Sequence, residues 1–198
     1  SNYKRGTMSL IPEFELGLWN AWIFMLPLVI VSIFGVRLFG KRVSGENSSD
    51  TRMEKLSFAC MHLIVIASYV YSVFLPLKLG TPWFYSGLLI YLSGMLITII
   101  AMLNFATTSV DKPVTKGVYT FSRNPMYVGE SLINISISIA CVSWIFFLVA
   151  VVVAILEHNI VVSEERFCLK KYGDAYREYM NRIPRWIGIP KSETNHNP

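Results

Sequence analysis

The residues best suited to chemistry lie in the second half of the chain, at the two ends of a long apolar stretch. Before it stands Arg-Asn-Pro-Met-Tyr-Val-Gly at 123–129, and after it stand Glu164-Glu165, Tyr172-Gly173 and further tyrosines. Lipid offers no water to a carboxylate or a guanidinium, so such groups at membrane depth need a partner or a task. The pattern indicates a ligand site at the edge of a membrane.

The composition is that of a membrane protein. Hydrophobic residues make up 53% of the 198 residues, charged residues only 16%, and the mean hydropathy is +0.46. Three stretches, 16–39, 56–77 and 83–105, reach the roughly 20 apolar residues that a helix needs to cross about 30 Å of hydrocarbon. The first stretch is too long for a signal peptide and has no small-residue cleavage site.

A fourth apolar block of 37 residues, 126–162, is either one long tilted helix or two shorter ones. Residues 140–144 form its most plausible turn, although they include neither Gly nor Pro. With two crossings, fifteen of the 18 Lys and Arg residues fall on one side and three on the other, whereas one crossing divides them 8 against 10. The positive-inside rule favours the first division. We therefore predict an all-α, polytopic bundle of five transmembrane helices, with helices four and five as a tight hairpin, the N-terminus outside and the C-terminus cytosolic.

One domain is expected over residues 1–198, with three membrane helices in 16–105 and the ligand-binding half in 106–190. The cations are spread over three cytosolic segments and form no single stripe, which argues against nucleic acid as a partner. The three cysteines follow no metal spacing, and Glu157-His158-Asn159 lacks the HExxH pattern, so no metal is expected.

The segment before helix four has the features of a binding loop. Residues 111–123 are punctuated by Gly117, which permits a sharp turn or a close backbone approach to a ligand. Pro125 is placed for the first helical turn, and the N–H groups after it form an anion-friendly helix start beside Arg123. By position alone, a snorkelling arginine that sets topology is the commoner explanation of Arg123. The neighbouring Tyr127 favours ligand contact.

Polar residues also line both halves of the hairpin. Glu130 and Asn134 share a helix face with Tyr127. Hydrogen bonding between helices explains Asn134 as well as a ligand does, and Glu130 less well. Glu164 and Glu165 are adjacent and diverge by about 100° on a helix, so we expect at most one of them to point into a pocket.

These motifs together resemble the isoprenylcysteine carboxyl methyltransferase family. Its pattern is Arg-His-Pro-x-Tyr-x-Gly, a helical hairpin, Glu-Glu, Phe/Tyr-Gly-x-x-Tyr-x-x-Tyr and Val/Ile-Pro. The resemblance covers roughly residues 104–186, and the short chain with five helices is similar to small prokaryotic, above all archaeal, members. Phospholipid N-methyltransferases and sterol reductases resemble the same half.

The resemblance implies a cytosolic site for S-adenosylmethionine, with S-adenosylhomocysteine as the product. A helix start suits the cofactor's carboxylate, while Glu164 and Asn104 suit its ammonium and ribose hydroxyls. Arg123 and Arg182 are the candidates for steering a substrate anion. The residues implied in cofactor binding are Asn104, Asp111, Lys112, Pro113, Val114, Tyr119, Asn124, Pro125, Met126, Tyr127 and Glu164.

The implied reaction methylates the carboxylate of a prenylated cysteine or a similar lipid-like substrate that enters sideways from the bilayer. A carboxylate is ionised at pH 7, so the enzyme needs alignment more than a base. Two positions depart from the family pattern: Asn124 replaces the usual His, and Ile160 stands where eukaryotic members carry a substrate-contacting Arg. Recognition of the substrate carboxylate is therefore rearranged, or the substrate is not a prenylcysteine.

Three other functions stay open. An N-methyltransferase of amine lipids would prefer carboxylates near the nucleophile, as Glu130 and Glu157 provide. A sterol-type reductase usually has a longer chain with more helices, and a transporter or channel subunit would bind no cofactor. Neither the identity of the lipid nor the oligomeric state follows from the sequence.

Overall fold

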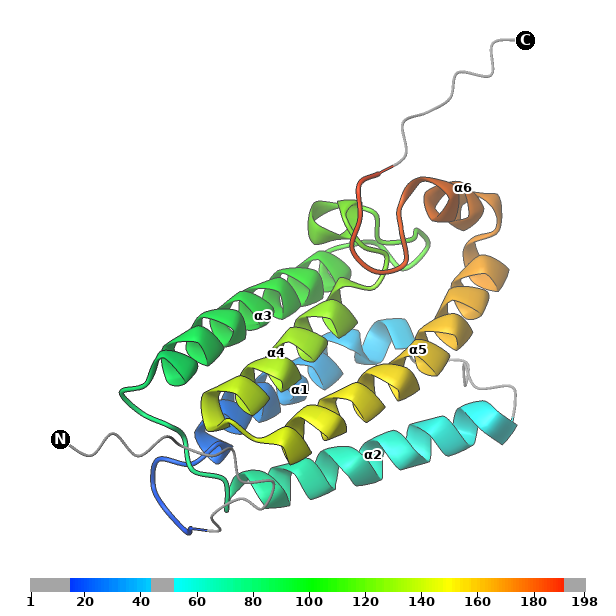
Figure 1. Cartoon of the computed structure of the whole chain (residues 1–198). Helices are drawn as coiled ribbons and strands as arrows, with labels where there is room; N and C mark the ends of the chain where they lie inside the picture. Colours follow the sequence, from blue (N-terminus) through cyan, green and yellow to red (C-terminus); the bar gives the residue numbers. More distant parts are fainter. Residues whose placement is uncertain (1–14, 44–51, 191–198) are drawn as a thin grey trace, which may run out of the picture.

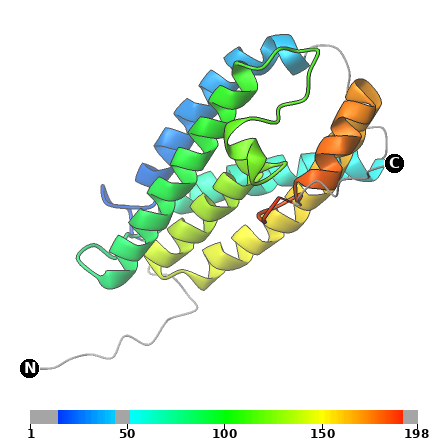
Figure 2. The same cartoon turned by 90° about the horizontal axis from the view of Figure 1, so that it is seen from above.

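The computed structural model describes residues 15–43 and 52–190. Within these ranges the chain forms helices and no strand beyond one isolated bridge between Asn20 and Pro76. The helices are α1 (Trp22–Val43), α2 (Arg52–Ser72), α3 (Pro82–Ala106), the 3-10 helix η1 (Gly117–Thr120), α4 (Pro125–Cys141), α5 (Trp144–Tyr172) and α6 (Asp174–Arg182). Figure 1 shows α1 to α5 as a bundle with η1 and α6 at one end, and Figure 2 shows from above that α2 lies at an angle to the other four long helices.

Three of the described helices are long and apolar enough to cross a membrane: Lys55–Ser72 in α2, all of α3 and all of α5. The apolar part of α1 is shorter, Trp22–Gly35, and α4 has 17 residues. The predicted all-α architecture is therefore confirmed. That all five helices cross the bilayer, and that the α6 end faces the cytosol, stay predictions.

The five long helices alternate in direction, so the connections gather at two ends. At one end the backbone N–H of Ala21 bonds to Leu75 O at 2.9 Å, and that of Lys78 bonds to Ala140 O at 3.0 Å. These bonds join the entry of α1, the α2–α3 connection and the α4–α5 turn. At the opposite end lie residues 107–124 and α6, which we call the cap (Figure 1). The cap contains most of the residues implicated by the sequence.

Small residues bring α3 and α4 into close contact. A Cβ atom on Gly94 would lie 2.8 Å from the carbonyl oxygen of Gly129, and one on Gly129 would overlap the hydroxyl of Thr98. A Cβ atom on Gly87 would likewise lie 2.7 Å from the Cβ of Ala140. Lipid gives helices no hydrophobic reason to associate, so close backbone packing supplies the attraction. The glycine of the 123–129 motif is thus a packing residue that fixes α4 against α3.

The hairpin predicted from charge is present, and its turn lies inside the predicted 140–144. Val142 adopts a left-handed conformation, φ 52 and ψ 48, which a β-branched residue rarely takes. The N–H of Ser143 bonds back to Ser138 O at 2.9 Å, as in a Schellman motif, and its hydroxyl accepts from Phe146 N at 3.2 Å. The chain thus turns without a glycine because two capping interactions close the helix ends.

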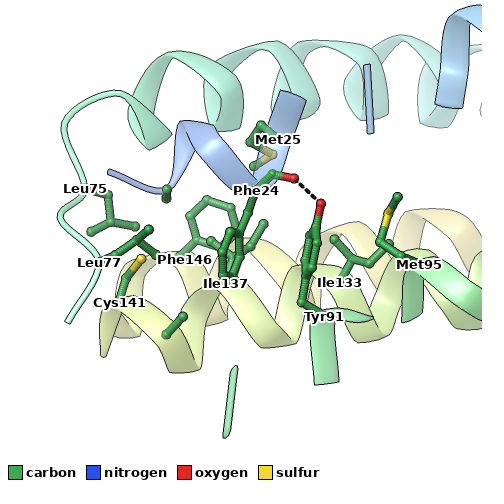
Figure 3. Close-up of a cluster of buried hydrophobic side chains, with 12 residues drawn as sticks. Phe24, Met25, Leu75, Leu77, Tyr91, Met95, Ile133, Ile137, Cys141 and Phe146 are labelled. Atoms are coloured by element: carbon green, nitrogen blue, oxygen red, sulfur yellow. Dashed lines mark hydrogen bonds between the residues drawn. The ribbon is translucent and has the colours of Figure 1, made fainter. Parts of the chain in front are cut away.

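The bundle end far from the cap is filled by apolar side chains, which we call the core end (Figure 3). Ile133, Ile137 and Phe146 have no exposed surface. The ring of Tyr91 lies 4.5 Å from that of Phe24, centroid to centroid, and its hydroxyl donates to Phe24 O at 2.7 Å. This packing joins α1, α3, α4 and α5 and sets the positions of the helix ends that carry the cap.

Candidate functional site

The cap is held together by a second apolar cluster. Its buried members are Ala101, Val114, Tyr119, Tyr176, Tyr179 and Ile183. The hydroxyl of Tyr179 donates to Tyr119 O at 2.7 Å, which joins α6 to η1. Burial raises the pKa of Tyr176 and Tyr179, so both phenols stay protonated at neutral pH. The cap is therefore a built element that covers the ends of α3, α4 and α5.

Asn104, in the last turn of α3, packs against the backbone of Gly117. Gly117 has φ +61, and a Cβ atom there would overlap the side-chain amide of Asn104, so both conformation and space require glycine. The Nδ2 atom of Asn104 is buried and has no hydrogen-bond partner among the described residues. A buried amide donor left unpaired costs about 1–3 kcal/mol. We infer that a ligand supplies the hydrogen-bond partner of this donor.

The start of α4 also presents donors to a ligand. Pro125 is its first residue, as the sequence predicts, and Asn124 precedes it without capping the helix by its side chain. The Asn124 amide instead donates to Glu165 Oε1 at 3.0 Å. The first-turn N–H groups of α4 therefore have no side-chain cap and attract negative charge.

Three polar contacts follow one another along the interface between α4 and α5, and we call them the rungs of the α4–α5 ladder. Each joins a residue on or directly before α4 to a glutamate on α5, and the two helices run in opposite directions. Such contacts are expected inside a membrane hairpin, because every polar group must find a partner there. The three rungs are Asn124–Glu165, Tyr127–Glu164 and Ser131–Glu157, at 3.0, 2.8 and 3.1 Å.

Glu165 is the centre of the upper rung and is only 3% exposed. Its carboxylate pairs with Arg123 Nε at 3.0 Å and with Arg185 Nη2 at 2.9 Å. The Nη1 group of Arg123 also donates to the carbonyls of Met180 and Ile183, at 2.7 and 2.9 Å. Glu165, Arg123 and Arg185 form a cluster that we call the arginine clasp. It holds the segment after α6 against the start of α4.

The sequence argument expected at most one of the two adjacent glutamates to point into a pocket, and it did not foresee that the other one would be buried in ion pairs. Glu164 bonds to Tyr127 on α4, while Glu165 is buried against Arg123 and Arg185. The 100° between the side chains is real, but residues 183–186 fold back over the side that an isolated helix would leave to solvent. The pairing of Glu165 with Arg185 was not predicted, because it depends on this return of the chain.

The implied cofactor residues and Arg182 fall into two groups, one buried or half-buried and one exposed. Val114, Tyr119 and Met126 meet in the cap's apolar cluster, and Tyr127 pairs with Glu164 below it. Pro125 is buried at the start of α4, and Pro113 is half-buried in the loop. The residues on the exposed rim of the cap are Asp111, Lys112 and Arg182.

The hairpin carries three carboxylates, Glu130, Glu157 and Glu164, and that of Glu130 lies within electrostatic range of the other two. Glu157 is 1% exposed, and its Oε1 atom has no hydrogen-bond partner among the described residues. No Lys, Arg or His of the described chain forms an ion pair with any of the three. Carboxylates in such surroundings favour a cationic ligand, such as a sulfonium or an ammonium group.

A comparison with known families agrees with this chemistry. Residues 78–175 match the family model of the phospholipid methyltransferases, a family within the isoprenylcysteine carboxyl methyltransferase superfamily. The match covers just under half of the chain, from the connection before α3 to the beginning of α6, and includes every residue implied in cofactor binding. It supports a membrane methyltransferase and leaves the acceptor open between a phospholipid and a prenylcysteine.

Proposed function

We propose that the protein is an S-adenosylmethionine-dependent methyltransferase that acts on a lipid acceptor at the membrane surface. The observation that carries the proposal is the buried, unpartnered amide of Asn104, held by Gly117 at the same bundle end as the Tyr127–Glu164 pair. The family match over 78–175 supports the same reaction class. The site faces the cytosol in this proposal, because that side collects fifteen of the 18 Lys and Arg residues.

The residues present fit the cofactor's chemical groups. The free N–H groups at the start of α4 suit its carboxylate, and Asn104 Nδ2 suits a ribose hydroxyl. Glu164 suits its positive charge, and the apolar cap suits its adenine. The proposed cofactor set is that of the sequence analysis: Asn104, Asp111, Lys112, Pro113, Val114, Tyr119, Asn124, Pro125, Met126, Tyr127 and Glu164.

Bound S-adenosylmethionine supplies an electrophilic methyl group on a sulfonium. The protein's task is to align the acceptor with that methyl group and to keep water away. In this proposal α4 and α5 hold the reacting groups beside the Tyr127–Glu164 pair, and the cap covers them. Glu165 and Arg185 position the cap and do not touch the substrate.

The acceptor that follows from the sequence is a lipid-attached carboxylate, such as that of a prenylated cysteine, steered by Arg123 and Arg182. The contacts of Arg123 use four of its five N–H donors. In this proposal Arg123 therefore mainly holds the cap, with one donor left for an anion, and Arg182 on the exposed rim provides the remaining positive charge.

A second acceptor, an amine lipid head group, is favoured by the three carboxylates that pair with no cation of the described chain. An ammonium group must lose its proton before nitrogen can attack a methyl group, and a buried carboxylate such as Glu157 is placed to receive it. Glu157→Gln should therefore abolish methylation of an amine and leave methylation of a carboxylate intact. The two acceptors thus make opposite predictions for one variant.

The experiment that tests the proposal is a calorimetric titration of the detergent-solubilised protein with S-adenosylhomocysteine. A saturable heat, reduced in Asn104→Ala, is the expected result. Absence of binding would overturn the methyltransferase proposal in favour of a reductase or a transport function. Assays with a phosphatidylethanolamine and with a prenylcysteine analogue then identify the acceptor.

A further inference from the structure

A groove of about 520 Å³ opens on the outer face of the hairpin, beside the site just described. Its floor is one face of α5, formed by Val151, Ala154, Ile155, His158 and Asn159. Ser131 of α4 and Trp186 of the segment after α6 complete it. The volume falls within the range of small-molecule sites, roughly 300–1,000 Å³. We call it the α5 groove.

The α5 groove faces lipid. It lies on α5, one of the helices apolar and long enough to span a membrane. The side chains of Val151 and Ile155 are 41% and 60% exposed, which in a bilayer means contact with acyl chains. A hydrocarbon chain can therefore reach the groove from the membrane without passing through water.

The groove changes character along its length. Its lower part is aliphatic, whereas its upper part carries the ring of His158, the amide of Asn159 and the hydroxyl of Ser131. The Trp186 ring lies 6.0 Å from that of His158, centroid to centroid, and closes the upper end. An apolar lower part and a hydrogen-bonding upper part match an amphiphile whose head points towards the cap.

The polar end of the groove leads to the proposed site of methyl transfer. Ser131 follows Tyr127 by four residues and Asn159 precedes Glu164 by five, which is about 6 and 7.5 Å along the two helices at 1.5 Å per residue. The Ser131 hydroxyl donates to Glu157, the lowest rung of the α4–α5 ladder. A head group passing Ser131 is thus about one helical turn from the Tyr127–Glu164 pair.

We propose that the α5 groove seats the hydrocarbon chain of the lipid acceptor, with its head group directed past Ser131 towards Tyr127 and Glu164. This inference rests on the proposed function, because it assigns the groove to that enzyme's substrate. It applies to a carboxylate and to an amine acceptor alike, since the chain and not the head group occupies the groove. It also gives the arginine clasp a second role, because Arg185 positions the neighbouring Trp186 over the groove.

Two adjacent valines provide a matched test. Val151 lines the groove and Val152 does not, yet both lie on α5 and are similarly exposed, 41% and 44%. Val151→Trp should fill the groove and raise KM for a long-chain acceptor about tenfold, the loss of contact with about two methylene groups, with kcat unchanged. Val152→Trp should leave KM unchanged, and neither variant should affect an acceptor with the same head group and a short chain.

A second variant and a second measurement guard against misfolding. Ile155→Trp should repeat the effect of Val151→Trp, and S-adenosylhomocysteine affinity should stay at the parent value in all three variants. A lipid with a photoreactive group in its acyl chain should label peptides covering 151–159 in the parent and lose that labelling in Val151→Trp.

The outcomes separate this inference from the proposed function. Turnover with equal KM for the Val151 and Val152 variants, or photolabelling spread evenly over the exposed faces of α2 and α3, overturns the groove assignment alone. Failure of the parent protein to bind S-adenosylhomocysteine overturns the proposed function, and the groove then loses its role as a substrate site. If a second copy of the chain covers the groove and keeps the photoreactive lipid out, the groove is a dimer contact, and this result would also overturn the inference.

Discussion

The core end and the cap end of the bundle are built from the same helices but differ in whether their buried polar atoms have hydrogen-bond partners. At the core end the Tyr91 hydroxyl, buried among apolar side chains, has a partner at 2.7 Å in Phe24 O. Three buried side-chain atoms of the described residues have no partner, on Thr98, Asn104 and Glu157, and none belongs to the core-end cluster. Burial without a partner is tolerated only where something offsets its cost. The contrast is what the proposed function predicts: complete pairing in the core-end cluster, and unpartnered polar atoms on the helices that lead to the cap.

The arginine clasp should contribute both to stability and to the proposed ligand site. Breaking it should therefore give the largest effect on both. Glu165→Ala leaves Arg123 and Arg185 without their common carboxylate in a buried place, which typically costs about 3–5 kcal/mol. We expect a lower melting temperature together with loss of S-adenosylhomocysteine binding, because residues 183–186 would no longer be held against α4. Thermal unfolding in detergent and calorimetry measure the two effects.

Glu178→Ala is the matched control for the clasp. Glu178 also lies near the C-terminus, on α6, but it is exposed and outside the clasp. Its removal should change neither property. A Glu165→Ala protein that melts and binds like the parent would show that the cap does not depend on the clasp.

The next effect should fall on the ligand alone. Glu164 pairs with Tyr127 and with no cation of the described residues, so its loss leaves no buried positive charge behind. If it binds the cofactor's positive charge, Glu164→Ala should weaken S-adenosylhomocysteine or S-adenosylmethionine binding by about 1.5–3 kcal/mol, roughly 10- to 150-fold. Unchanged affinity, measured by calorimetry beside the Glu178→Ala control, would remove Glu164 from the site.

How much of the structure could be predicted from the sequence depends on how far apart in the chain the interacting residues lie. Hydropathy located the long helices from local composition. The charge balance over the whole chain predicted two crossings in 126–162, and the turn lies inside the expected 140–144. The burial of Glu165 was not predictable, because it requires residues 183–186 to return over the end of α5. The position of Asn104 against Gly117 likewise depends on a loop that crosses from α3 to α4. The assignment of these residues to a cofactor stays a prediction.

A pair of small deletions sharpens the comparison between the two ends. Tyr91→Phe removes a buried hydroxyl together with its hydrogen bond to Phe24 O, so stability should fall by about 0.5–1.5 kcal/mol while ligand affinity is unchanged. Asn104→Ala removes an amide donor without a partner, so stability should hardly change while S-adenosylhomocysteine affinity falls by about 1 kcal/mol, or roughly fivefold. If both variants lose stability and neither loses affinity, the cap end is no different from the core end.

The smallest expected effect is a gain, and it lies at the core end. Val142 occupies the left-handed region at φ 52, a conformation that costs a residue with a Cβ atom about 1–2 kcal/mol and costs glycine far less. Val142→Gly should therefore raise stability by about 1 kcal/mol, seen as a higher melting temperature, without changing S-adenosylhomocysteine affinity. Ser143→Ala, which removes the hydroxyl that caps Phe146 N, should lower stability by about 0.5–2 kcal/mol at the same turn. A Val142→Gly protein that is less stable than the parent would mean that contacts of the valine side chain outweigh the backbone strain. The turn would then be held by packing, as the rest of the core end is.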